Sequence, residues 1–262
     1  NISKLKTKST SMDGPTILKK IQDESITFLD FWFVDIFGEL RRMGMPSYAI
    51  SEDSFKHGLE KLDASSIVGF KSVNKSDMIL KPDPVTFRIL PPEYDNGHRK
   101  NARLICDLYE GNTSTESRYN RDSRGITKKA SEKLSEVGLT HTNWGPEIEF
   151  FVFDAINIYP SPYAATHSYG GSGYSIESKE SPWTKGNIST AIDLKEGYYP
   201  SQPKDTLEGF RKDVCDDLYK FFGIKIEAEH HEVATSGQCE INLVYDEMII
   251  MADNVIAVKN LV

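Results

Sequence analysis

Four glutamates on two short apolar stretches are the residues best placed to do chemistry. Glu147 and Glu149 lie two apart in the run Trp144–Phe153, WGPEIEFFVF. In an extended strand, residues two apart face the same side, about 6.6 Å from each other. The aliphatic and aromatic neighbours predict a strand that is at least half buried. Two carboxylates on one face of such a strand repel each other unless a positive group lies between them.

The second stretch is His230–Glu240, HHEVATSGQCE. Residues 235–237, TSG, predict a three-residue hairpin loop with its glycine in the left-handed region, which would place Glu232 opposite Glu240. Like charges about 5 Å apart cost roughly 3 kcal/mol at an effective dielectric near 20. Such glutamates pair with Arg or Lys or hold divalent cations, and all-oxygen ligands favour Mg²⁺ or Mn²⁺. The spacing alone leaves open that both pairs lie on ordinary solvent-facing strands.

Composition narrows the class of protein. The chain has 262 residues, a net charge of −8 and three scattered cysteines without a C-x-x-C pair. The absence of a basic patch argues against nucleic-acid binding, and no apolar run reaches the ~18 residues that a membrane span needs. The odd, scattered cysteines indicate buried free thiols and predict a cytoplasmic protein.

The first half of the chain predicts a small sheet. Residues 1–12 are expected to be a flexible tail, and Asp13 begins a helix. Phe28–Asp35 and Leu40–Met45 predict a hairpin, and residues 102–109 a further strand. Leu62–Asp77 predicts a long loop, and Met78–Pro92, interrupted by four prolines, predicts short edge strands at most.

The second half follows a polar linker at residues 110–117, which we take as the domain boundary. Asp122 is expected to cap a helix that runs to Val137 and buries Ile126, Ala130 and Leu134. Ser161–Asn187 predicts a long loop. Two further helices are expected, one capped by Asp205 and running to Phe222, the other over Asp246–Val262. Because the strands come in hairpins rather than alternating with helices, the fold class is predicted as α+β.

Taken together, these stretches resemble glutamine synthetase of the dodecameric bacterial and archaeal type. The resemblance covers residues 25–262 and is carried by four motifs in the family order. These are LDASSIVGFKSVNKSDM, GPEIEFFVFD, GYYPSQPKD and EAEHHEVATSGQCE. Four ordered motifs are far more specific than any one pair of glutamates.

The resemblance implies a fold and a reaction. Residues 13–115 would form a β-grasp domain. Residues 116–262 would form the first part of the catalytic domain, a curved antiparallel sheet with outer helices. The reaction would be ATP-dependent ligation of ammonia to L-glutamate through γ-glutamyl phosphate. Phosphoryl transfer onto a carboxylate fits this implication, because it needs cations between the phosphate and carboxylate oxygens.

The resemblance also implies a role for particular residues. Glu149, Glu232 and Glu240 would hold one divalent ion, and Glu147 would be one ligand of a second ion. His230 would lie near the transferred phosphate, and the adjacent His231 is expected to be a polar residue on the outer face.

Glu227 and Tyr245 match positions that line the ATP site, although Tyr245 could equally be a core aromatic. Asp63 matches a residue that binds ammonium and helps deprotonate it, and Asp77 matches a second acid nearby. In the family this acidic loop completes the site of a neighbouring subunit. A homo-oligomer is therefore implied, as a hexameric ring or two stacked rings.

The chain also departs from the family pattern. It stops before the family's second half, so we expect a catalytic domain truncated on its C-terminal side that is inactive alone. Cys239 stands where Asn or Gly is frequent, Glu229 where bacterial members have a third His, and Leu243-Val244 where a basic residue is usual. Two alternatives remain open. One is a ligase that joins glutamate to an amine or polyamine, and the other is a non-catalytic member that assembles with a catalytic paralogue.

Overall fold

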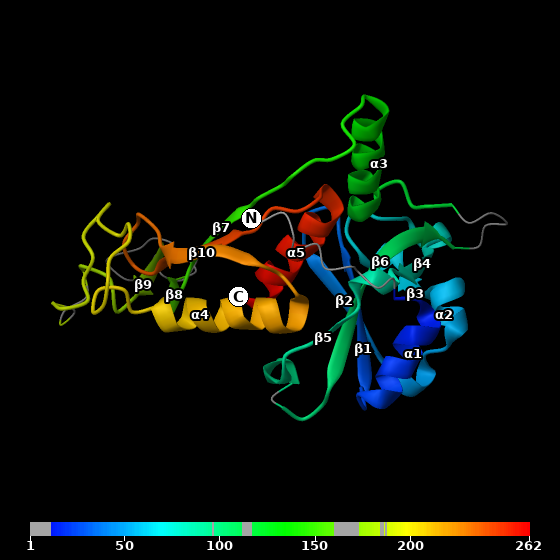
Figure 1. Ribbon diagram of the computed structural model, residues 1–262, viewed down its shortest axis with the longest axis horizontal. Helices are drawn as coiled ribbons and strands as arrows, with labels where there is room; N and C mark the ends of the chain where they lie inside the picture. The colour runs from blue at the N-terminus through cyan, green and yellow to red at the C-terminus, as the bar shows by residue number, and fades with distance from the viewer. Residues whose placement is uncertain (1–11, 96, 112–116, 160–172, 184–185, 187) are drawn as a thin grey trace, which may run out of the picture. The chain divides into compact units, whose positions relative to one another are not determined.

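The computed structural model describes residues 12–95, 97–111, 117–159, 173–183, 186 and 188–262 (Figure 1). The expected tail at residues 1–12 falls outside this description except for Met12. The chain divides into two compact units. The first comprises Asn1–Asn143 with Asp246–Asn260, and the second comprises Trp144–Tyr245 with Leu261–Val262.

The first unit is built on a six-stranded sheet with the order β2-β1-β6-β4-β3, in which β5 also pairs with β6. Neighbours β1 and β6 run parallel, whereas the remaining pairs are antiparallel. The expected hairpin is confirmed as β1 and β2. The strands are β1 (Phe28–Val34), β2 (Leu40–Pro46), β3 (Leu59–Asp63), β4 (Asp77–Pro82), β5 (Arg88–Ile89) and β6 (Asn101–Glu110).

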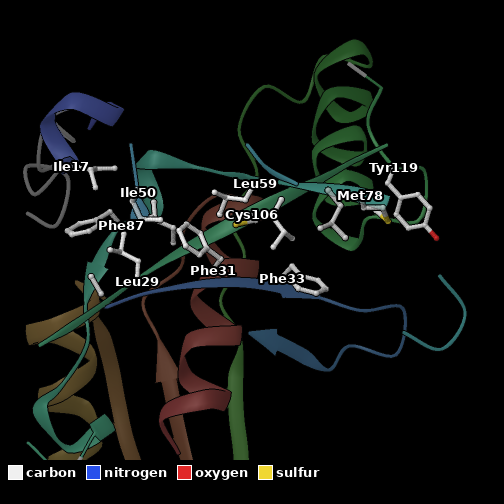
Figure 2. Close-up of a cluster of buried hydrophobic side chains, with 14 of the residues drawn as sticks. Ile17, Leu29, Phe31, Phe33, Ile50, Leu59, Met78, Phe87, Cys106 and Tyr119 are labelled. Atoms are coloured by element: carbon white, nitrogen blue, oxygen red, sulfur yellow. The ribbon is translucent and has the colours of Figure 1, made fainter. Parts of the chain in front are cut away.

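One face of this sheet makes the core of the first unit (Figure 2). Alternate residues of β1 point into it, since Leu29, Phe31 and Phe33 are buried. Helices α1 (Gly14–Asp23) and α2 (Glu52–Lys56) supply further apolar side chains, and Ile17 of α1 is fully buried. The predicted start of α1 is confirmed, and the carboxylate of Asp13 caps the helix by accepting a hydrogen bond from the Thr16 amide at 2.9 Å.

One expectation for this sheet is wrong. Strand β4 is not an edge strand, since it lies between β6 and β3. Its prolines do not break it, because Pro82 is its last residue and the others follow it. The long loop predicted at Leu62–Asp77 is confirmed over residues 64–76, which connect β3 to β4 and contain only two short 3-10 turns.

Helices α3 (Ser123–Glu136) and α5 (Met248–Leu261) complete the first unit. Asp122 caps α3 as predicted, accepting from the Gly125 amide at 3.1 Å. The predicted apolar stripe is wrong, since Ile126 is 54% exposed while Arg124 is buried. Arg124 instead forms ion pairs with Asp83, Asp107 and Asp253 at 2.7–2.9 Å. These ion pairs tie α3 to β6 through Asp107 and to α5 through Asp253.

In the described part of the second unit, two small antiparallel sheets accompany one α-helix. The sheets are β10-β11-β7 and β8-β9. The predicted loop at Ser161–Asn187 is wrong where it falls on β9, and its residues 161–172, 184–185 and 187 lie outside the described residues. Helix α4 follows Leu207 rather than Asp205, and a π-helical turn, Leu218–Phe222, extends it to Gly223. The elements are β7 (Glu147–Phe151), β8 (Ala155–Tyr159), β9 (Gly173–Glu177), α4 (Glu208–Asp217), β10 (Ile226–His231) and β11 (Gln238–Leu243).

The α+β class is confirmed by these elements. All three cysteines are free, and Cys106 and Cys239 are buried as expected. In the part of the chain that the structure describes, no helix is long and apolar enough to cross a membrane.

Candidate functional site

One face of the sheet β10-β11-β7 carries the glutamates singled out in the second unit together with His230. Glu149 pairs directly with Glu240, and Glu240 pairs directly with His230, so these three side chains form a row across the sheet. Glu147 lies two residues from Glu149 and pairs with Asn242. The prediction that Glu147 and Glu149 share a face is confirmed by this register.

The side chains of His230, Glu232 and Glu240 converge on one point. Single ligand atoms from His230, Glu232 and Glu240 all lie within 4.8 Å of one another. The ring nitrogens of His230 lie 3.7 Å from a carboxylate oxygen of Glu232 and 3.6 Å from one of Glu240. Burial raises the pKa of Glu240, and the neighbouring Glu232 raises it further. The two carboxylates therefore repel each other at this point, as they would in a cation site without its cation.

Two amide side chains aim the carboxylates. Gln238 donates from Nε2 to Glu149 at 2.8 Å, and Asn242 donates from Nδ2 to Glu240 at 2.9 Å. Each amide contacts one of the two oxygens of its carboxylate. These contacts orient Glu149 and Glu240 toward the same row.

The predicted hairpin register is wrong. Glu232 pairs with Gln238 through a 2.9 Å backbone hydrogen bond, and Glu240 pairs with His230. This pairing leaves residues 233–237 as the loop, which is longer than the predicted three residues. Within it Ser236 and Gly237 both adopt positive φ angles, 64° and 84°. Glu232 reaches Glu240 from the end of the strand rather than from directly across it.

The predicted position of His231 is also wrong. Its side chain is 1% exposed and lies on the opposite face of β10 from His230. Its Nε2 lies 2.9 Å from a carboxylate oxygen of Glu180, which is fully buried. Burial alone would lower the pKa of His231, but the hydrogen bond to Glu180 raises it above the usual value. His231 therefore belongs to a buried ion pair and not to an outer surface.

A second buried ion-pair cluster lies on this back face. Arg211 of α4 is 1% exposed. It bonds Asp205 at 2.6 Å and Glu229 of β10 at 2.6 Å, and its Nη1 lies 3.7 Å from the sulfur of Cys239. Two departures from the family pattern, Glu229 and Cys239, thus meet the same guanidinium.

Two tyrosines that the sequence analysis did not single out border the acidic cluster. The rings of Tyr198 and Tyr199 stack at 4.1 Å, and the Tyr199 ring lies 4.5 Å from that of His230. Their hydrogen bond, together with some burial and the nearby carboxylates, raises the pKa of Tyr198 to about 12. Both tyrosines belong to the motif GYYPSQPKD, but the residues of this motif do not indicate that the rings lie against His230.

The two residues predicted to line the ATP site, Glu227 and Tyr245, lie at the other end of the same sheet. Glu227 is an exposed residue of β10, beside a register shift between Ile226 and Ala228. Tyr245 follows β11 and is 56% exposed, so the alternative of a core aromatic is wrong. An exposed aromatic face of this kind is suited to stacking on a flat ring.

Asp63 and Asp77 form a separate acidic pair in the first unit. They end β3 and begin β4, and they pair directly across the two strands. Both line a hollow of about 390 Å³. Asp63 accepts hydrogen bonds from the amide and hydroxyl of Ser65 at 3.0 and 2.6 Å, and these bonds lower its pKa. Asp63 is thus held as a carboxylate at the surface, a form that attracts a small cation.

Comparison with known proteins identifies the family. The sequence model of the glutamine synthetase beta-Grasp domain matches residues 25–111, and that of the glutamine synthetase catalytic domain matches residues 120–262. The chain belongs to the glutamine synthetase family. The resemblance drawn from the four motifs is confirmed at this level.

Individual relatives agree with this assignment. Glutamine synthetase from Sulfolobus acidocaldarius is 40% identical over 242 residues, which cover 92% of this chain and 48% of that protein. The enzyme from Aquifex aeolicus is 36% identical over 249 residues, which cover 94% and 50%. The chain spans about half the length of these relatives.

A solved structure supports the fold independently. Glutamine synthetase from Plasmodium falciparum superposes with a TM-score of 0.80 at 23% identity, over 95% of this chain and 47% of that one. At this identity the likeness concerns the fold alone. It agrees with the α+β architecture and the β-grasp sheet described above.

Proposed function

We propose that this chain forms part of a glutamate–ammonia ligase, which joins ammonia to L-glutamate with ATP through γ-glutamyl phosphate. In this proposal the chain belongs to a longer protein, with a β-grasp domain at residues 13–115 and catalytic-domain residues at 116–262. The observation that carries the proposal is the convergence of His230, Glu232 and Glu240 within 4.8 Å, with Glu149 directly beside Glu240.

The donor set fits a hard divalent cation. Carboxylate oxygens dominate it and a single imidazole is present, a combination that suits Mg²⁺ or Mn²⁺. We assign Glu149, Glu232 and Glu240 to one ion, and Glu147 to a second ion that needs further ligands. Bound ions would neutralise charge on the transferred phosphoryl group. The chain's own part is to hold four carboxylates on one face, with Gln238 and Asn242 aiming two of them.

The acidic pair Asp63 and Asp77 is assigned to ammonia. A carboxylate gathers ammonium by charge and accepts the proton that must leave before the nitrogen attacks. We propose that this pair serves the site of a neighbouring subunit in a homo-oligomeric ring, a hexamer or a stacked dodecamer. Glu227 and Tyr245 are assigned to the nucleotide, with the exposed Tyr245 ring against the adenine, and His230 to the phosphate.

The free thiols of the described cysteines suit a reducing compartment, and we therefore place the protein in the cytoplasm. The expected inactivity of these 262 residues alone remains a prediction. It can be tested by comparing them with the complete protein in the same assay.

Two measurements on the complete protein test the function. Mn²⁺ titration should show binding that Glu149→Ala weakens and that the exposed-site control Glu177→Ala leaves unchanged. Failure of the wild type to bind Mn²⁺ would favour the non-catalytic member of the family. A substrate screen should then show ADP release with glutamate that depends on ammonia. A preference for a polyamine over ammonia would favour the amine ligase instead.

The role of Asp63 has its own test. Asp63→Asn should raise the KM for ammonia by roughly tenfold or more while the KM for glutamate changes little, because only ammonium capture loses its charge. Asp53→Asn, an exposed aspartate of α2, serves as the matched control. Equal KM values for ammonia in both variants would remove Asp63 from the site.

A further inference from the structure

The back face of β10 carries a fully buried histidine–glutamate pair that the proposed reaction does not use. Glu180 is saturated with partners: one oxygen faces His231, and the other accepts from the amide and hydroxyl of Thr206 at 2.8 and 2.9 Å. Both partners of the ion pair are at most 1% exposed. Burying two ionisable groups is costly unless each finds complementary groups, and here each does.

The hydrogen-bond geometry of His231 defines its protonation. Its Nδ1 lies 2.8 Å from the carbonyl oxygen of Gly197 and 2.7 Å from that of Glu232. Its Nε2 lies 2.9 Å from the Glu180 carboxylate. All three neighbours are acceptors, so both ring nitrogens donate. The ring is a fixed donor bridge between Glu180 and two backbone carbonyls.

Those two carbonyls belong to the segments that border the candidate metal site. Glu232 lies just past the last residue of β10 and has lost the regular ladder, although its amide still bonds Gln238. Gly197 precedes Tyr198 and Tyr199, and its amide donates to the carbonyl of Val233 at 3.1 Å. A Cβ on Gly197 would lie 2.3 Å from the carbonyl oxygen of Ala234, so the backbones of the two segments are in direct contact and leave no room for a side chain at Gly197.

We propose that His231, held by Glu180, is a positioning residue for the metal site. Its Nδ1–H fixes the carbonyl of Glu232 and thereby keeps the Glu232 carboxylate within reach of His230 and Glu240. The same N–H also faces the carbonyl of Gly197, and this second contact keeps the Tyr198–Tyr199 rings against His230. This inference rests on the proposed metal site, and it adds a support that touches neither the cation nor the substrates.

Two substitutions separate the two ends of the imidazole. The amide nitrogen of Asn occupies nearly the position of histidine Nδ1, and that of Gln nearly the position of Nε2. His231→Asn therefore keeps a donor for the Glu232 carbonyl but leaves Glu180 without its partner. His231→Gln keeps the partner of Glu180 but releases the carbonyl.

The experiment measures Mn²⁺ affinity by electron paramagnetic resonance and stability by urea unfolding, both on the complete protein. A positioning role predicts that the more stable of the two variants binds Mn²⁺ more weakly. His231→Gln should be the more stable variant yet bind Mn²⁺ about 10–100-fold more weakly than wild type, the usual effect of losing a support behind a ligand. His231→Asn should bind within about threefold of wild type, by the same reasoning.

Further variants protect this test against unfolding. If His231→Asn fails to fold, the double variant Glu180→Gln/His231→Asn removes the unpaired buried charge and takes its place. His141→Gln, at an exposed histidine, should change neither quantity. Affinity and stability that fall in the same order would overturn the positioning role alone. No Mn²⁺ binding by the wild type would overturn both this inference and the proposed metal site.

Discussion

Glu240→Gln should have opposite effects on stability without and with Mn²⁺. The substitution keeps the shape of the side chain and removes one charge from a cluster whose ligand atoms lie within 4.8 Å of one another. Two carboxylates at that distance repel by about 3 kcal/mol at an effective dielectric near 20. His230 and the Asn242 amide offset part of this. We therefore expect the metal-free variant to be about 1–2 kcal/mol more stable than wild type.

Mn²⁺ should reverse this order. Free Mn²⁺ at 1,000 times the wild-type Kd stabilises by about 4.1 kcal/mol. If the lost carboxylate weakens binding a hundredfold, the same concentration is only ten times the variant's Kd and stabilises by about 1.4 kcal/mol. The metal-induced gain thus falls by about 2.7 kcal/mol, which exceeds the gain from relieved repulsion.

Thermal unfolding in EDTA and in Mn²⁺ measures both quantities. For a chain of this size 1 kcal/mol corresponds to a shift of about 2–4 °C in Tm. Glu177→Gln, the same change at an exposed strand position, should behave as wild type in both buffers. A Glu240→Gln variant that is less stable in EDTA and gains as much from Mn²⁺ as wild type would refute the metal assignment.

Three further changes test the supports around the site. Arg211→Met should destabilise by about 3–5 kcal/mol in urea, because it leaves the buried Asp205 and the half-buried Glu229 without their cation. Gly197→Ala should weaken Mn²⁺ binding and lower Tm, since the new Cβ would lie 2.3 Å from the carbonyl oxygen of Ala234. Burial would raise the pKa of Asp107, but Arg124 and its neighbours hold it below the usual value. That lowered pKa stabilises the fold above the unfolded-state pKa, so Asp107→Asn should lose stability at pH 7, and its deficit should shrink as the pH falls through the folded-state pKa.

Matched controls accompany these variants. Lys212→Ala, next to Arg211 but exposed, should stay within about 0.5 kcal/mol of wild type. Gly209→Ala lies in α4, where a Cβ meets nothing within 4 Å, and should not destabilise. A Gly197→Ala protein as stable as Gly209→Ala, or an Asp107→Asn deficit that persists unchanged in acid, would contradict the corresponding reasoning.

Local patterns in the sequence predicted the elements that depend on local physics. Asp13 and Asp122 cap their helices because a short carboxylate reaches the free amides of the first turn. Glu147 and Glu149 share a face because side chains alternate along a strand. The four family motifs then indicated the fold of the two domains and the residues of the candidate site.

Non-local contacts could not be predicted in this way. The partner of His231 is Glu180, 51 residues away, so nothing near HHE indicates a buried ion pair. The hairpin register depended on a left-handed Ser236, a conformation that serine rarely adopts. The position of β4 was not predicted, because the prediction relied on the number of prolines and not on their positions. Pro82 is the last residue of the strand and does not interrupt it.

Strand β10 has a consequence for how this protein can be altered. Its residues alternate between the carboxylate face, with His230, and the ion-paired face, with Glu229 and His231. Deleting or inserting a single residue within it would exchange the two faces. Glu229 and His231 would then face the candidate metal site, and His230 would be forced against α4. Length changes are therefore forbidden along β10, whereas the same changes in a surface loop would be absorbed.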